Sequence, residues 1–136
     1  MRELQRDYAA RIVPPPTIVE LEEKRKLPPA ELKAREAELI LAAVPAGARL
    51  IALDRRGAAW SSEEFARRLG EWRDRGLTSA FALGGAEGLG EALLSRADDV
   101  LSFGTMTWPH FLARNMLLEQ LYRAQQILAG HPYHRG

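Results

Sequence analysis

Cysteine is absent from this sequence of 136 residues, which excludes disulfide bonds, cysteine zinc sites and cysteine nucleophiles. Long apolar runs are absent as well. The longest, residues 39–48, contains a proline and a glycine and is shorter than the roughly 18 residues that a membrane span needs. No signal-peptide pattern opens the chain, because charges of both signs occur within residues 2–7. These absences favour a cytoplasmic protein.

A large charge imbalance is also lacking, since the net charge is only +1. This value argues against a generally basic nucleic-acid-binding protein, but it permits a local basic patch. The charged run 22–26 has mixed sign and is interpreted as a solvated loop, with a binding patch as the alternative. The length predicts one domain, residues 1–136, with a small hydrophobic core.

Helical and strand patterns alternate along the chain. Leu4, Tyr8 and Ile12 repeat at helical spacing, and the prolines 14–16 end that helix. Ser61 and Glu64 form a capping-box pattern before another helix. The predicted helices cover 2–12, Pro28 to Pro45, Ser61 to Gly76, a short stretch through 89–94, and Pro109 to Gly130; the predicted strands are 17–21, 50–53, 81–83 and 100–103. This alternation predicts an α/β fold with a mostly parallel sheet flanked by helices.

Apolar residues in the last predicted helix define its expected core face. We expect Leu112, Met116, Tyr122 and Ile127 to point inward. The apolar positions of this helix, including Phe111 and those at 116–118 and 121, wrap more than one face, which exceeds what one core contact requires. The excess predicts a homodimer that packs through residues 110–128.

Three strand ends are followed by glycine-bearing or polar loops, after Leu53, Leu83 and Phe103. In open α/β sheets, ligands bind outside the carboxyl ends of the strands. The loop 84–88, Gly-Gly-Ala-Glu-Gly, permits close approach of a ligand to the backbone, or it forms a tight turn alone. It lacks the spacing of a dinucleotide-binding loop and the Lys-Ser/Thr of a P-loop.

The last third of the chain carries all three histidines. His110 and Arg114 are four residues apart on one helix face, where they fit an anionic partner; an exposed helix start is the alternative. The segment Tyr133-His134-Arg135 combines a stacking ring, an imidazole and a guanidinium, a set used on single-stranded RNA, although chain ends are often frayed and inert. A metal site formed by His131 and His134 is weakly supported without nearby acids.

Together, several motifs resemble the RlmH family, the bacterial ribosomal large-subunit pseudouridine methyltransferases of the SPOUT superfamily. The motifs are LGGAEG at 83–88, SFGTMTWPH at 102–110, LLEQLYRA at 117–124 and HPYHR at 131–135. The resemblance runs from about Tyr8 to the end of the chain, in order and at the family's spacing. Each motif is weak alone, whereas the combination is specific.

The resemblance implies methylation of N3 of a pseudouridine in 23S ribosomal RNA, with S-adenosylmethionine (SAM) as cofactor. It implies a deep trefoil knot in the C-terminal half and an obligate homodimer packed through the last helix. By motif, the SAM contacts fall on Leu53, Gly84, Phe103, Gly104, Thr105, Met106, Thr107 and Trp108. Catalytic candidates are His110, Arg114, His134 and Arg135, and the RNA-binding residues are Arg114, Tyr133, His134 and Arg135.

The sequence departs from the family at its start. Family members begin with an apolar strand that ends in a Val-Gly turn, whereas this chain starts inside the helix that follows. We therefore expect a SPOUT domain shortened at its N-terminus, with an exposed sheet edge if the strand is absent. Ala86 replaces a proline common in the family. The alternative function is a non-catalytic RNA- or nucleotide-binding module derived from such an enzyme.

Overall fold

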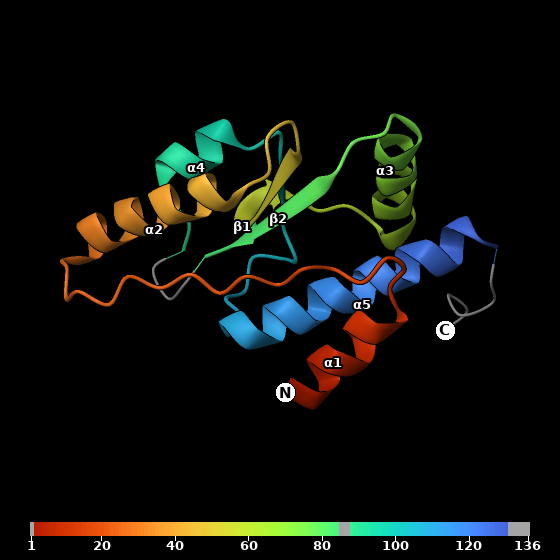
Figure 1. Cartoon of the computed structure of the whole chain (residues 1–136), viewed down its shortest axis with the longest axis horizontal. Coiled ribbons are helices and arrows are strands. Elements are labelled where there is room, and N and C mark those ends of the chain that lie inside the picture. Colours follow the sequence, from red (N-terminus) through yellow and green to blue (C-terminus); the bar gives the residue numbers. More distant parts are fainter. Residues whose placement is uncertain (1, 85–87, 131–136) are drawn as a thin grey trace. The chain divides into compact units, whose positions relative to one another are not determined.

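The computed structural model describes residues 2–84 and 88–130 (Figure 1). The chain divides into two compact units. One unit contains a parallel sheet with helices α2 and α4, and the other contains helices α1, α3 and α5. No helix in the described ranges combines the length and the apolar character needed to cross a membrane. The single domain over residues 1–136 stays a prediction.

The sheet of the first unit has three parallel strands in the order β2-β1-β3. The central strand β1 (Arg49–Ala58) pairs with β2 (Ser79–Leu83) and with β3 (Asp99–Leu101). Leu50, Ile51 and Ala52 of β1 are buried, as a continuous apolar run in a central strand predicts. The helices between the strands provide the crossover connections that parallel pairing requires.

Helices α2 (Pro29–Ala43) and α4 (Glu91–Arg96) pack against each other and against the sheet. Alternate strand residues point to this face, because side chains alternate across a strand. Leu50, Ala52 and Ala82 therefore meet Ala37 of α2 and Leu93 of α4 in one buried cluster. Leu93 is fully buried, so this cluster is the core that holds both helices beside the strand ends.

The helical unit is built around α5 (His110–Leu128), which packs against α1 (Arg2–Arg11) and α3 (Ser62–Asp74). Gln125 of α5 exchanges two hydrogen bonds with the backbone of Val13, at 3.0 and 2.7 Å. Ser62 at the start of α3 donates to Gln120 of α5 at 2.7 Å. These contacts fix both shorter helices to α5 within this unit.

The predicted helices and the parallel sheet are confirmed. Ser61 caps α3, because its hydroxyl accepts a hydrogen bond from the Glu64 backbone N–H at 3.0 Å. Gly76 follows α3 in the left-handed region, with φ of 72°. The run 22–26 lies in a loop, and most of its residues are exposed.

Four details of the sequence-based prediction were wrong. Residues 17–21 form no strand, because no described strand pairs with them; they are extended and exposed. β1 continues to Ala58 through a register irregularity, where an exit loop was expected after Leu53. β3 ends at Leu101 instead of Phe103. In α5 the buried residues are Asn115, Leu117, Leu118 and Ala124, whereas Leu112, Met116, Tyr122 and Ile127 are only half-buried.

Candidate functional site

Leu53 of β1 lies in one row with the last residues of β2 and β3. It is in register with Leu83 on one side and with Leu101 on the other. β2 and β3 therefore end at the same edge of the sheet, which is the edge at which open parallel sheets bind ligands. β1 continues past this row to Ala58, so the predicted exit of the chain after Leu53 is wrong.

The segment after β2 turns back tightly on itself. A Cβ atom at Gly84 would lie 2.6 Å from the Gly88 carbonyl carbon and 2.8 Å from the Leu89 nitrogen, so no side chain fits there. Gly88 has φ of 79°, a conformation that glycine adopts without strain. Gly84 thus makes a close backbone approach to its own chain, which supports the tight-turn interpretation. Residues 85–87 of the predicted loop lie outside the described residues.

Ser102 anchors the segment after β3. Its side chain is buried, and its hydroxyl accepts a hydrogen bond from the Gly104 N–H at 3.0 Å. The same hydroxyl lies 3.2 Å from the Arg55 carbonyl oxygen, while the Ser102 N–H donates to the Ala58 carbonyl at 2.9 Å. Residues 104–107 beyond this anchor are exposed. The segment is therefore fixed at its base and open along its length, as a ligand-binding loop requires.

An ion-paired group connects the second half of β1 to the start of α4. Asp54 accepts hydrogen bonds from the backbone and guanidinium of Arg56, at 2.9 and 2.8 Å, and Arg56 also contacts Glu91 of α4 at 3.0 Å. The Arg56 guanidinium keeps the pKa of Asp54 below its ordinary value. Sequence reasoning missed this group, because Arg56 and Glu91 are far apart in the chain. It fixes two segments at the ligand-binding edge.

His110 and Arg114 contact each other at the start of α5. Arg114 Nη2 lies 3.1 Å from His110 Nε2, and Arg114 Nη1 donates to Gln5 Oε1 of α1 at 3.0 Å. Arginine has no acceptor, so Nη2 is the donor and His110 Nε2 carries the lone pair. The predicted pairing of the two side chains is confirmed, and Gln5 is a partner that sequence reasoning missed.

The predicted site residues therefore fall into three sets. Leu53, Gly84 and the segment 103–107 belong to the sheet unit, while Trp108, His110 and Arg114 belong to the helical unit. The predicted residues Tyr133, His134 and Arg135 lie outside the described residues, as does His131. Within the described ranges, no three or more histidine, aspartate or glutamate side chains are grouped to hold a metal ion.

Comparison with known proteins assigns this arrangement to a family. The family model described as "Predicted SPOUT methyltransferase" matches residues 1–134. The "Ribosomal RNA large subunit methyltransferase H" of Paramagnetospirillum magneticum is 56% identical over 135 residues, which cover 98% of this chain and 89% of the relative. The protein of the same name from Rhodospirillum centenum is 57% identical, with 99% and 90% covered. Matches of this extent show that the chain belongs to the SPOUT methyltransferase family.

Proposed function

We propose that this protein methylates N3 of a pseudouridine in the 23S RNA of the large ribosomal subunit, with SAM as the methyl donor. The observation that carries the proposal is that β2 and β3, each followed by a motif segment of the family, end at one edge of the sheet in the row that contains Leu53. The relatives named above carry the name of a ribosomal RNA methyltransferase. This chain matches them over 89% and 90% of their length. An RNA substrate of this kind places the reaction in the cytoplasm.

The described residues fit an adenosyl cofactor. Leu53 is half-buried at the strand edge, and the open segment 103–107 offers backbone donors and acceptors next to the buried Ser102. Met106 and Trp108 are 72% and 40% exposed, so apolar surface is free for a ring or an aliphatic chain. Leu53, Gly84, residues 103–107 and Trp108 would hold SAM, which supplies an electrophilic methyl group on a sulfonium. Positioning of the two reactants in line is then the main catalytic task.

Arg114 and His110 supply the charge and proton chemistry of the proposal. Methyl transfer forms the N3–CH₃ bond, breaks the methyl–sulfur bond and releases the N3 proton. Arg114 would stabilise negative charge on the flanking carbonyl oxygens of the base. The lone pair of His110 Nε2 faces Arg114, so His110 can accept a proton there only after the guanidinium turns to the RNA. His134 and Arg135 are the alternative pair for the same two roles.

The proposal includes an obligate homodimer packed through α5 and a deep trefoil knot in the C-terminal half. Exposed apolar side chains at both ends of α5 support the dimer: Trp108 and Phe111 are 40% and 52% exposed at its start, and Leu128 is 39% exposed at its end. Tyr133, His134 and Arg135 would bind the RNA by stacking and by charge-assisted hydrogen bonds.

The test is methyl transfer from isotope-labelled SAM to large ribosomal subunits that lack the modification. Nucleoside mass spectrometry should then detect N3-methylated pseudouridine, and the label should be absent when pseudouridine is replaced by uridine at the target. A different methylated nucleoside would contradict the assigned substrate. SAM binding by calorimetry without transfer to any ribosomal substrate would instead support a non-catalytic binding module.

A further inference from the structure

All three lysines of the chain, Lys24, Lys26 and Lys33, lie within ten residues. Lys24 and Lys26 are exposed, and Lys33 is half-buried. None of them forms an ion pair within the part of the chain that the structure describes. Many arginines do, among them Arg25, Arg35, Arg49, Arg56, Arg67, Arg68, Arg73 and Arg123. Within the described residues, the positive charge of the lysines is therefore not compensated by an ion pair.

Glu23 fixes the loop that carries Lys24 and Lys26. Its carboxylate accepts hydrogen bonds from the Arg25 N–H at 3.1 Å, from the Arg25 guanidinium at 2.9 Å and from Arg35 of α2 at 3.0 Å. The Glu23 side chain is only 10% exposed. These hydrogen bonds, mainly those from the Arg25 side chain, lower the pKa of Glu23 to about 2, so it stays ionised at neutral pH. The loop is thereby attached to α2 in a defined conformation.

In the described residues, the carboxylates of Glu23 and Glu38 form ion pairs with arginines and not with the lysines. Arg25 interacts with Glu23 and also with the charge of Glu31, and Arg35 contacts both Glu23 and Glu38. Residues 22–33 carry four cations, Lys24, Arg25, Lys26 and Lys33, and three glutamates, so this segment has a net charge of +1. The local excess of positive charge is consistent with the low net charge of the whole chain, +1.

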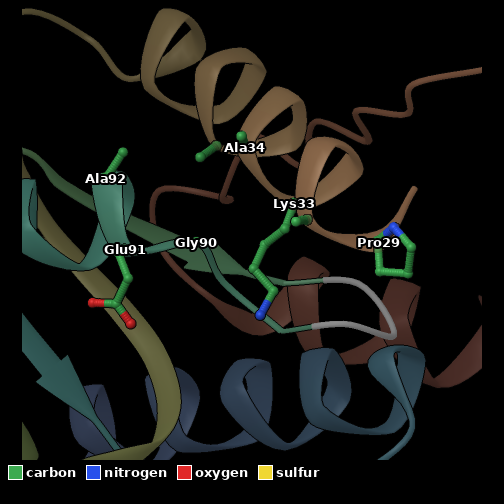
Figure 2. Close-up of a pocket in the computed structure, with 8 residues that line it drawn as sticks. Pro29, Lys33, Ala34, Gly90, Glu91 and Ala92 are labelled. Carbon is green, nitrogen blue, oxygen red and sulfur yellow. The ribbon is translucent and has the colours of Figure 1, made fainter. Parts of the chain in front are cut away.

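Lys33 places this charge next to the ligand-binding edge of the sheet. A cleft of about 440 Å³ lies between the first turns of α2 and the start of α4, lined by Pro29, Lys33, Gly90 and Glu91 among others. Figure 2 shows the Lys33 side chain extending from α2 across this cleft. Its stem packs close to Gly90, where an added Cβ would lie 3.4 Å from Lys33 Cγ. Glu91 is paired with Arg56, and Lys33 is the charged lining residue without an ion pair among those that the structure describes.

We propose that Lys24, Lys26 and Lys33, here called the lysine surface, bind the phosphate backbone of the ribosomal RNA that flanks the target nucleotide. Lysines are flexible point charges that suit phosphate contacts without base recognition. The cleft beside Lys33 opens at the edge where the proposed cofactor segments leave the sheet, so backbone bound there would lead toward the reacting base. This inference rests on the proposed function, because it takes the substrate to be ribosomal RNA.

The test compares two triple variants that remove the same charge. Lys24→Gln/Lys26→Gln/Lys33→Gln removes the lysine surface, and Arg2→Gln/Arg75→Gln/Arg96→Gln removes three cations elsewhere. Binding to large ribosomal subunits is measured across salt concentrations. Each lost phosphate contact should reduce the slope of log affinity against log salt by roughly 0.7–0.9. The lysine variant should therefore lose about 2 in slope and bind more weakly, while the arginine variant retains most of both.

Two further measurements separate charge from folding and from the proposed function. A Lys24→Arg/Lys26→Arg/Lys33→Arg variant keeps the charge and should bind like the parent, and all variants should bind SAM equally in calorimetry. Unchanged affinity and slope in the glutamine variant, with a parent that binds subunits, would overturn the lysine surface alone. A parent that does not bind large subunits at all would overturn the proposed function together with it.

Discussion

At the scale of single residues, Gln5 shows how a residue remote in sequence can act on the proposed catalytic group. It is 109 positions from Arg114, yet its amide oxygen accepts a hydrogen bond from that guanidinium at 3.0 Å. Arg114 therefore has its two terminal nitrogens directed at Gln5 and His110. A side chain held in this way loses less rotamer entropy when it meets the substrate.

Replacing Gln5 should consequently slow methyl transfer without weakening SAM binding. A hydrogen bond to a charged group contributes about 1.5–3 kcal/mol, so Gln5→Ala should reduce kcat by about 10- to 100-fold. Gln5→Glu keeps an acceptor oxygen and should restore most of the rate. Gln126→Ala, on α5, is the control for removing a glutamine side chain. Equal rates for Gln5→Ala and the parent would show that Gln5 does not position Arg114.

Glu23 offers a second residue-scale prediction, which concerns pH. Its pKa is about 2 in the folded protein and 4.5 in the absence of these partners. A lowered folded-state pKa contributes stability that is present above the unfolded-state value and is lost as the pH falls toward the folded-state value. Glu23→Gln should therefore lower the melting temperature at pH 7.

The difference in melting temperature between Glu23→Gln and the parent should shrink as the pH falls from 4.5 toward 2. Thermal unfolding followed by circular dichroism over this range measures it. Glu22→Gln removes the neighbouring exposed carboxylate and should leave the melting temperature at pH 7 nearly unchanged. A constant difference for Glu23→Gln at all pH values would mean that its carboxylate does not hold the loop.

At the scale of elements, the segment after β3 depends on Ser102 at its base. Removing the buried Ser102 hydroxyl leaves the Gly104 N–H and the Arg55 carbonyl without this partner, which costs about 1–3 kcal/mol. Ser102→Ala should lower the free energy of unfolding by about that amount and weaken SAM binding, because residues 103–107 lose their anchor. Ser95→Ala, at an exposed helical position, is the matched control. Full SAM affinity in Ser102→Ala would contradict the anchoring role.

The elements also show how far the sequence predicts this fold. Helices α2, α3 and α5 and strands β1 and β2 follow from apolar periodicity, capping residues and apolar runs, which are local signals. Residues 17–21 have the composition of a strand, but a strand forms only when another strand pairs with it. The buried face of α5 was misassigned because apolar residues occur all round this helix, so periodicity does not select one face.

The candidate site was predictable for the same local reasons, and only in part. The ends of β2 and β3 follow from local signals, so Gly84 and the segment 103–107 could be placed at one edge, whereas the continuation of β1 past Leu53 could not be foreseen. Three hydrogen-bonded pairs were missed: Arg114 with Gln5, Arg56 with Glu91, and Arg35 with Glu23. The partners in each pair are at least 12 positions apart in the chain, and no periodic pattern connects them. Long-range side-chain pairs of this kind depend on the tertiary fold rather than on local propensity.

At the scale of the whole molecule, the proposed homodimer raises the question of whether one active site uses both chains. The cofactor segment 103–107 and the tail residue Arg135 are both needed in the proposal, and α5, which separates them in the chain, is the proposed interface. If the tail of one chain completes the cofactor site of its partner, a defect in the segment and a defect in the tail can compensate each other. This holds only when the two defects are on different chains of the dimer.

Co-expression of two inactive variants tests this arrangement. Gly104 has φ of 110°, so Gly104→Val should distort the cofactor segment, while Arg135→Ala removes the tail guanidinium. If the two variants pair at random, about half of the dimers are mixed. Each mixed dimer has one intact site out of two, so activity should recover to about a quarter of the parent rate. The two variants carry different affinity tags, which allows the mixed dimers to be isolated. If isolated mixed dimers show no methyl transfer, each chain builds its site alone. If no mixed dimers can be isolated because the protein is monomeric, the proposed dimer itself is overturned.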